Sequence, residues 1–175
     1  RVEGFFPSIG CWVNYCLGSL NDNLPQYVVM GTPVADCCGG HEAHRANYLG
    51  PRYDGVPLKI DPADPLPYAK PAQGVYREEQ AGEFDLLRRL NRMTADRFPD
   101  DTALRARIRS YELAFRMHTA VPEVVRFEDE TCETQAMYGL DQKETRTFGQ
   151  QMLAARRLVE RGVRFVHVYH GGNGG

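Results

Sequence analysis

Val163-Arg164-Phe165-Val166-His167-Val168-Tyr169-His170-Gly171-Gly172 is the stretch that decides the fold of this chain. Its first seven residues are rich in β-branched and aromatic side chains and place apolar groups on both faces. This is the pattern of a central strand in a parallel sheet that helices cover on either side. We therefore expect a buried strand over 163–169 that leads directly into a glycine-rich loop.

A helix is predicted immediately before this strand. Thr147 and Gln150 have the spacing of a capping box, so the helix should begin near Thr147, and Gly162 suits its end. The apolar residues expected to face the core are Phe148, Met152, Ala155, Leu158 and Val159. Helix, glycine and strand in succession form an α/β unit, so the predicted fold class is α/β.

A second helix and strand are predicted within residues 1–30. Ser8 can cap a helix, and Gly18 suits the left-handed position after its last turn. The inward positions by helical spacing are Ile9, Trp12, Val13, Cys16 and Leu17. A compact β-branched run over 26–30 ends at Gly31 and indicates a buried strand.

The middle of the chain divides into a loop region and a helical hairpin. Prolines and glycines recur through 31–76 and leave no room for a long regular element. Helices are predicted over about 77–97 and 102–120, with Asp101 as the cap of the second and Pro122 as its stop. Their apolar positions are Phe84, Leu86, Leu87, Leu90 and Met93, then Leu104, Ile108, Tyr111, Phe115 and His118.

The bulk properties are those of one globular domain. The 175 residues are 42% hydrophobic and 25% charged, with a formal net charge of −2. This mixed charge argues against a nucleic-acid partner, and no apolar run is long enough for a membrane span. The five cysteines have no repeated spacing and do not indicate a disulfide framework. We interpret residues 1–175 as a single partial domain that is truncated at both ends and includes a helix, strand and glycine-rich loop over 147–175.

His170 is the candidate ligand residue that the local pattern identifies. It follows the predicted strand directly, and ligands in open α/β sheets bind outside the carboxyl ends of the strands. A metal could use its imidazole as a ligand. The alternative is an ordinary loop or capping histidine, while His167 inside the strand is interpreted as a core residue.

Other candidate chemistry is weaker. Cys37, Cys38, His41 and His44 bring sulfur and imidazole ligands close together, but their spacing matches no standard zinc pattern, so a solvated loop is the preferred interpretation. The chain has no nucleophile elbow, P-loop or dinucleotide fingerprint. The arginine pairs Arg88-Arg89 and Arg156-Arg157 are interpreted as solvated helix faces.

Several motifs resemble a known bacterial family. They are Ser8-Ile9-Gly10 with Trp12 and Tyr15, Asn23-Leu24-Pro25, Leu49-Gly50-Pro51-Arg52-Tyr53-Asp54, Leu87-Arg88-Arg89-Leu90-Asn91-Arg92, Ser110-Tyr111-Glu112-Leu113-Ala114, and the run from Ala155 to Val166. Together these motifs, spread over nearly the whole chain, resemble the family called domain of unknown function 1501, which is abundant in planctomycetes.

This resemblance implies a sulfatase-like fold of the alkaline phosphatase superfamily, with the helical hairpin beside the sheet and the proline-rich loop near a substrate entrance. It implies a divalent metal such as zinc or calcium, of whose ligands only His170 lies within this chain. The nucleophile and the other ligands would lie outside residues 1–175, so this chain alone is expected to be inactive.

Two functions are compatible with these features. The first is metal-dependent hydrolysis of phosphate or sulfate esters, on a small molecule or a polysaccharide, by an exported or periplasmic protein. The alternative is a non-catalytic protein that binds glycan or cell-surface material on the same fold. The strands over 26–30 and 163–169 are expected to lack sheet neighbours, which would make the isolated chain only marginally stable.

Overall fold

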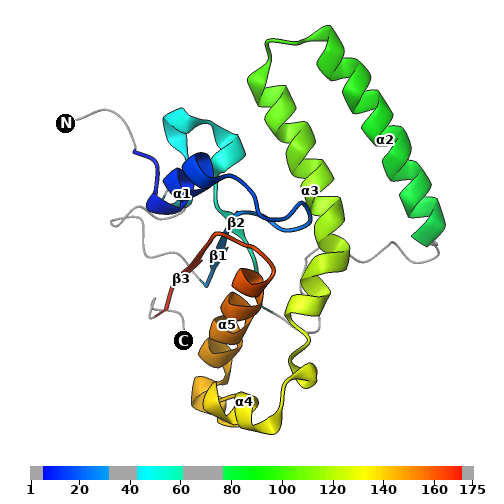
Figure 1. The fold of residues 1–175 in the computed structure, drawn as a ribbon. Helices are drawn as coiled ribbons and strands as arrows, with labels where there is room; N and C mark the ends of the chain where they lie inside the picture. Colours follow the sequence, from blue (N-terminus) through cyan, green and yellow to red (C-terminus); the bar gives the residue numbers. More distant parts are fainter. Residues whose placement is uncertain (1–5, 32–42, 61–76, 171–175) are drawn as a thin grey trace.

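The computed structural model describes residues 6–31, 43–60 and 77–170, without the side chains of 77–81 and 118–119. Helices surround a small parallel sheet of three strands (Figure 1). The predicted α/β class is therefore confirmed. No described helix combines the length and the apolar character needed to cross a membrane.

The sheet has the order β2-β1-β3, and both neighbouring pairs run parallel. Its strands are β1 (Tyr27–Met30), β2 (Val56–Pro57) and β3 (Phe165–Val168). β1 is central and completely buried, whereas every residue of β3 is only half-buried. The prediction that the last strand is central is wrong for the described residues, because β3 lies at one edge of the sheet.

β2 is the strand that the sequence did not predict. It lies inside the region expected to be one long loop, and its two residues pair with Val28 and Val29. Pro57 has no N–H to donate, which suits a short edge strand. With β2 on one side and β3 on the other, β1 has two neighbours, so the expectation that it lacks them is also wrong.

Helix α1 (Ile9–Leu17) begins and ends where its caps predict. The Ser8 hydroxyl accepts a hydrogen bond from the Cys11 N–H at 3.4 Å, and Gly18 after the last turn has φ of +60°. The buried face, however, consists of Gly10 and Cys11. A Cβ atom at Gly10 would lie 2.5 Å from the Tyr27 ring, so this narrow face lets the helix pack directly on β1.

The large apolar residues of α1 therefore point away from the sheet, contrary to the prediction. Ile9 is 74% exposed, Leu17 is 57% exposed and Trp12 is 40% exposed. The aromatic rings on this outer side contact one another, since Trp12 and Tyr15 form an edge-to-face pair at 5.9 Å. Helical spacing located the apolar stripe, but the close contact at Gly10 decides which stripe is buried.

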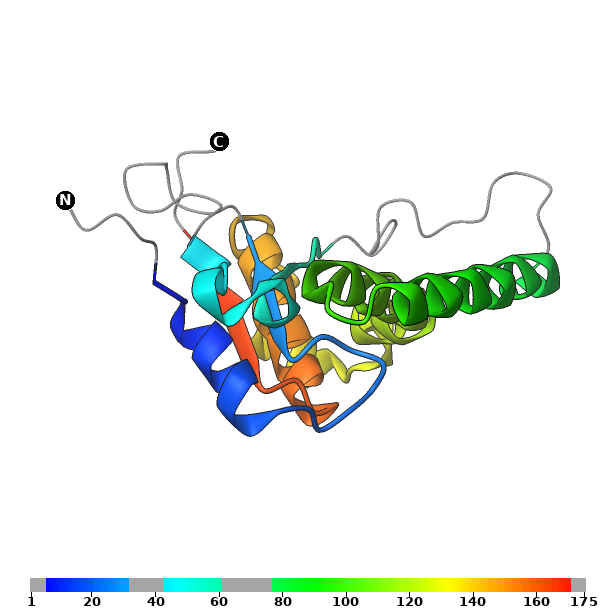
Figure 2. The same cartoon turned by 90° about the horizontal axis from the view of Figure 1, so that it is seen from above.

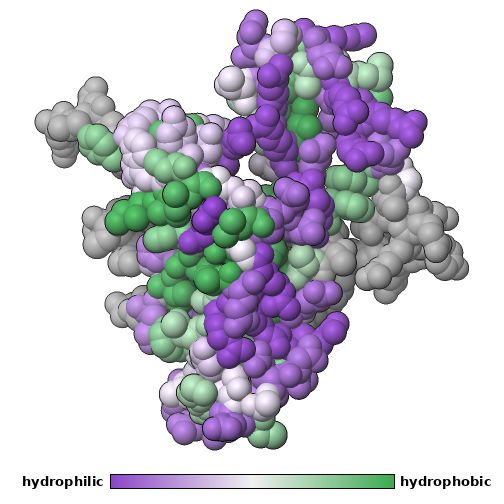
Figure 3. Space-filling model, in the orientation of Figure 1, coloured by the Kyte–Doolittle hydropathy of each residue, from purple (hydrophilic) through white to green (hydrophobic). Residues whose placement is uncertain are grey.

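The predicted hairpin is present as α2 (Arg77–Arg97) and α3 (Thr102–Val124), with α3 between α2 and the sheet (Figures 1 and 2). Asp101 caps α3 by accepting a hydrogen bond from the Leu104 N–H at 2.8 Å, as expected. Phe84 and Phe115 join the two helices through stacked rings 3.8 Å apart. The other predicted inward residues of α2 are about half exposed or more: Leu86, Leu87, Leu90 and Met93. On the face seen in Figure 3, the hairpin surface is mostly hydrophilic, with smaller hydrophobic areas between.

Pro122 does not stop α3, contrary to the prediction. The helix continues to Val124, and the Val125 N–H still donates to the Val121 carbonyl at 3.3 Å. Proline removes a single backbone donor, and this loss near a helix end is tolerable when the remaining carbonyls have other partners. Here Arg157, from the last helix, donates hydrogen bonds to the Glu123 and Val124 carbonyls in the last turn.

The last helix, α5 (Lys143–Glu160), begins four residues before Thr147 and has no side-chain cap, so the predicted capping box is wrong. It follows the short helix α4 (Cys132–Met137). A Cβ atom at Gly149 would clash with the Tyr138 carbonyl oxygen, which shows how closely α5 packs on the turn after α4. The buried residues of α5 are Gly149, Leu153, Ala154, Arg157 and Leu158.

The predicted inward face of α5 is therefore only partly correct. Leu158 is buried, and Ala155 packs against the core, but Val159 is 56% exposed. Gly162 ends the helix as predicted, with φ of +89°.

The hydrophobic core forms two layers on opposite faces of β1. Val28 and Met30 face α3 and α5, and the larger cluster there includes Met117, Val121, Val124, Leu153 and Leu158. Tyr27 and Val29 face α1 and the segment after residue 43, where they meet Cys11 and Ala46. Alternate residues of a strand point to opposite faces, so four consecutive buried residues require cover on both sides.

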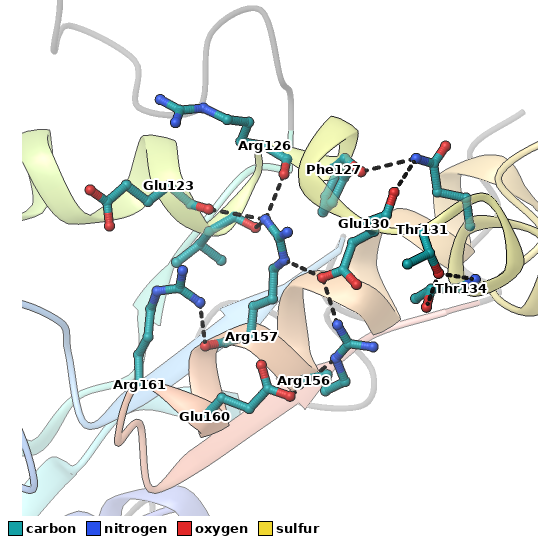
Figure 4. Close-up of polar contacts among 12 residues, drawn as sticks. Glu123, Arg126, Phe127, Glu130, Thr131, Thr134, Arg156, Arg157, Glu160 and Arg161 are labelled. Atoms are coloured by element: carbon teal, nitrogen blue, oxygen red, sulfur yellow. Dashed lines mark hydrogen bonds and ion pairs between the residues drawn. The ribbon is translucent and has the colours of Figure 1, made fainter.

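Arg157 joins α5 to the end of α3, and Figure 4 shows its contacts. Its guanidinium donates to the Arg126 carbonyl at 2.6 Å, the Glu123 carbonyl at 3.1 Å and the Glu130 carboxylate at 2.8 Å. Arg156 reaches the same Glu130 oxygen at 2.6 Å. Arg157 is only 6% exposed, so the prediction of a solvated arginine pair is wrong for this residue.

We expect Arg157→Leu to lower the free energy of unfolding by about 3 kcal/mol, because it leaves buried carbonyls and a carboxylate without their donor. Urea unfolding followed by circular dichroism measures this change. Arg126→Gln is the matched control, since the Arg126 side chain is exposed, and it should change stability by less than about 0.5 kcal/mol. Equal effects of the two substitutions would contradict a structural role for Arg157.

Glu130 should make stability depend on acid pH. Hydrogen bonds from Arg156 and then Arg157 lower the pKa of its carboxyl group. A lowered folded-state pKa stabilises the fold above the unfolded-state value of about 4.3, and this stabilisation is lost as the pH falls through the folded-state pKa. The stability difference between the wild type and Glu130→Gln should therefore be constant from about pH 6 to 8 and shrink below about pH 4.

The control for this titration is Glu128→Gln, because Glu128 is exposed and lies in the same short segment. The difference in the free energy of unfolding between the wild type and Glu128→Gln should stay small at every pH. A wild-type to Glu130→Gln difference that did not change with pH would show that the ion pairs with Arg156 and Arg157 do not stabilise the fold.

Candidate functional site

The candidate site is the edge of the sheet where β1 and β3 both end. Met30 lies opposite Val168 in the parallel register, so the residues that follow the two strands leave the sheet side by side. The Tyr169 N–H donates to the Met30 carbonyl at 2.8 Å and extends the ladder by one residue. Gly31 follows β1, and His170 lies just beyond β3 at this edge, where open α/β sheets bind ligands.

Gly31 allows the two chain exits to approach closely. It has φ of +85°, a backbone conformation that favours glycine. A Cβ atom at this position would also clash with the carbonyl oxygen of Tyr169. Any side chain here would push the two strand ends apart, so Gly31 fixes the geometry of the edge.

His170 lies at the end of β3 with its side chain exposed. Its ring contacts Phe148 near the start of α5, with ring centroids 4.2 Å apart. This contact orients the imidazole without using either ring nitrogen. The exposed imidazole can therefore serve as one metal ligand, and Phe148, which was predicted to face the core, instead supports it.

Behind this edge, His167 is half-buried in β3, so the prediction of a core residue is only partly correct. Its ring stacks on Tyr169 at 4.2 Å, and its Nδ1 atom lies 3.5 Å from the Tyr27 hydroxyl. Burial lowers the pKa of His167 and raises the pKa of Tyr27 to about 12. At neutral pH both side chains are therefore uncharged, which suits a packed layer rather than acid–base chemistry.

Cys11, on the same side of the sheet, is also a poor nucleophile. It is fully buried, and its Sγ atom lies 3.1 Å from the Ser8 hydroxyl and 3.5 Å from the His44 carbonyl. Burial raises the pKa of this thiol, so the reactive thiolate is disfavoured. Cys11 therefore acts as a small apolar residue that packs between α1 and β1.

The structure changes the interpretation of the cysteine and histidine motif in part. Cys37, Cys38 and His41 lie outside the described residues. His44 is only 9% exposed, and its carbonyl accepts a hydrogen bond from the Gly55 N–H at 2.9 Å. The prediction of a solvated loop is therefore wrong for His44, which is part of the compact segment that covers Tyr27.

The described residues supply one candidate metal ligand at this edge. Across 6–31, 43–60 and 77–170, no three histidine, cysteine, aspartate or glutamate side chains come together as a group that could hold a metal ion. His170 thus fits a metal as a single ligand and requires others that the described residues do not provide. A second feature, an arginine-lined cleft between the segment 47–53 and α3, has no signal in the sequence, because it joins residues far apart along the chain.

A comparison with protein families finds one match that covers almost the whole chain. The family model described as "Protein of unknown function (DUF1501)" matches residues 1–173. No curated protein and no solved structure matches the chain significantly.

Gly31→Ala tests the close approach at the edge of the sheet. The substitution adds a side chain at positive φ and against the Tyr169 carbonyl, so we expect a loss of at least about 2 kcal/mol in the free energy of unfolding. Gly82→Ala is the control, because Gly82 is exposed in α2 and has open space around it. It should leave stability unchanged or raise it by up to about 1 kcal/mol. Gly31→Ala with unchanged stability would contradict this geometry.

Proposed function

Because the chain belongs to the DUF1501 family, we propose that it is part of a metal-dependent hydrolase of phosphate or sulfate esters with an alkaline-phosphatase-like fold. The observation that carries the proposal is the exposed imidazole of His170 at the shared exit of two parallel strands. Enzymes with parallel sheets place their ligands at this edge. The motifs quoted from the sequence support the choice of ester hydrolysis by resemblance.

In this proposal, His170 binds a divalent metal such as zinc or calcium through a neutral imidazole nitrogen. A metal at this position supplies Lewis-acid polarisation of the ester and stabilises the charge that develops during transfer. Phe148 holds the His170 ring, and Gly31 keeps the two strand exits together. We assign the nucleophile and the remaining ligands to residues other than those that the structure describes, and we propose an exported or periplasmic location.

The alternative function is non-catalytic binding of glycan or other cell-surface material on the same fold. A specific observation favours it, namely a cleft lined by three arginines and two tyrosines beside α3. Such a cleft can recognise an anionic ligand without chemistry. The two proposals differ in one measurable respect, because only the hydrolase requires a metal for its function.

The test uses the longest natural protein that contains these 175 residues. We expect elemental analysis to find a bound divalent metal and p-nitrophenyl phosphate or p-nitrophenyl sulfate to be hydrolysed in a metal-dependent way. His170→Ala should lower both the metal content and the rate, the latter by about tenfold or more. Phe148→Leu should lower the metal content less than His170→Ala does, because it removes the ring contact that orients the imidazole but keeps the imidazole itself.

Two results would defeat the hydrolase proposal. One is a natural protein that binds no divalent metal and turns over neither ester. The other is His170→Ala with full metal content and unchanged turnover, which would show that this histidine is not a ligand.

A further inference from the structure

A cleft of about 410 Å³ lies between the first turns of α3 and the two short 3-10 helices η3 (Asn47–Leu49) and η4 (Pro51–Tyr53). Arg52, Arg105 and Arg109 line it, together with Tyr48 and Tyr53. We call this group the arginine cleft. Its volume falls within the range of small-molecule sites.

Among the described residues, no carboxylate forms an ion pair with the three arginines of the arginine cleft. Its lining contains no aspartate or glutamate. Arg105 and Arg109 are four residues apart on α3 and so share one face of the helix, where like charges repel. Across the described part of the chain, neither makes an ion pair, and the Arg52 guanidinium lies over the Tyr53 ring at 5.4 Å.

The acidic residues that follow Arg52 and precede α3 are engaged elsewhere. The Asp54 carboxylate accepts a hydrogen bond from the Ala46 N–H at 2.6 Å, and the Asp101 carboxylate caps α3 through the Leu104 N–H. Two adjoining cavities share some of these arginines but also contain acidic residues. One of about 320 Å³ contains Arg52 and Arg109 with Glu112, and one of about 430 Å³ contains Arg105 and Arg109 with Asp96 and Glu112. The three arginines therefore meet without acidic groups only on the η3 side.

The two tyrosines add flat apolar surface next to these charges. Tyr48 is 65% exposed, and its ring packs edge-to-face on Trp12 at 6.2 Å. Tyr53 packs in the same way on Tyr15 at 5.2 Å. Each tyrosine ring thus contacts an aromatic residue of α1, and this contact restricts its movement beside the arginines. Rigid aromatic rings stack on the apolar faces of ligands, and arginine forks bind oxyanions with two parallel hydrogen bonds.

We propose that the arginine cleft binds a sugar that carries a sulfate or phosphate ester, with the arginines on the oxyanion and the tyrosines against the sugar ring. A guanidinium fork matches the geometry of either oxyanion, so the two esters share one recognition chemistry. This proposal goes beyond ester hydrolysis, because it requires binding alone and involves neither His170 nor a metal.

Isothermal titration calorimetry of the full natural protein tests the proposal with galactose 6-sulfate, galactose 6-phosphate and galactose. We expect the two esters to bind and galactose not to bind measurably. Arg105→Gln with Arg109→Gln should weaken ester binding at least about tenfold, because two charge-assisted contacts are lost. A preference between the two esters shows which oxyanion the cleft selects.

Two control variants and one further variant of the cleft separate binding in the arginine cleft from binding elsewhere on the protein. Arg107→Gln removes an exposed arginine from the same helix between Arg105 and Arg109, and it should leave the affinity within about twofold. His170→Ala should also leave it unchanged, which distinguishes the arginine cleft from the proposed metal site. Tyr48→Leu should weaken binding of the sugar esters but not of inorganic sulfate.

Several outcomes would overturn the proposal. They are unchanged affinity in the double arginine variant, an equal loss in Arg107→Gln, equal binding of galactose, and loss of binding in His170→Ala. Tighter binding of a short single-stranded oligonucleotide than of either sugar ester would replace the sugar with nucleic acid as the ligand. Circular dichroism of each variant verifies that the fold is retained.

Discussion

The buried guanidinium of Arg157 is the interaction on which the arrangement of the helices depends. A charge with only 6% of its residue surface exposed is tolerated when its donors are satisfied, and here backbone carbonyls at the end of α3 and the Glu130 carboxylate satisfy them. Without Arg157, the carbonyls in the last turn of α3 would have no hydrogen-bond donor, because the helix ends before it can supply one. One side chain thus closes α3 and fixes α5 against it. Because β3 follows α5 after a turn at Gly162, the position of β3 beside β1 depends on this contact as well.

The second constraint is the cover of β1 on both faces. Its alternate residues enter two separate clusters, one with α3 and α5 and one with α1 and the segment from His44 to Gly55. The second cluster requires close packing, since Cβ atoms at Gly10 and Gly55 would both contact the Tyr27 ring. This explains why α1 buries its smallest residues. The large apolar side chains of α1 remain outside, where Trp12 and Tyr15 support Tyr48 and Tyr53 of the arginine cleft.

The features of the fold that could be predicted from the sequence are those that interactions between residues close together along the chain determine. Ser8, Asp101 and Gly162 act at helix ends through neighbours a few residues away, so their positions could be predicted, as could the helices α1, α2, α3 and α5 and the two longer strands. The short helix α4 was not predicted. The inward faces of α1 and α5, the two-residue strand β2 and the burial of Arg157 depend on partners far away in the sequence. For the candidate site, the place of His170 at a strand end was predictable from the strand pattern. Its contact with Phe148 and the close approach at Gly31 were not, because both involve another element.

The length of α3 shows how one helix serves both the core and the arginine cleft. Its 23 residues span about 35 Å, whereas a strand of four residues spans about 13 Å, so the helix extends well beyond the sheet. Its carboxyl half carries Met117, Val121 and Val124 into the core. Its amino half has no sheet to cover, and its first turns lie beside η3 and η4 across the arginine cleft. That half can therefore carry Arg105 and Arg109 beside Arg52, because charged side chains on an exposed helix face do not have to be buried in the core. The physical separation of the two halves is what allows a binding surface to be built on a helix that also holds the fold together.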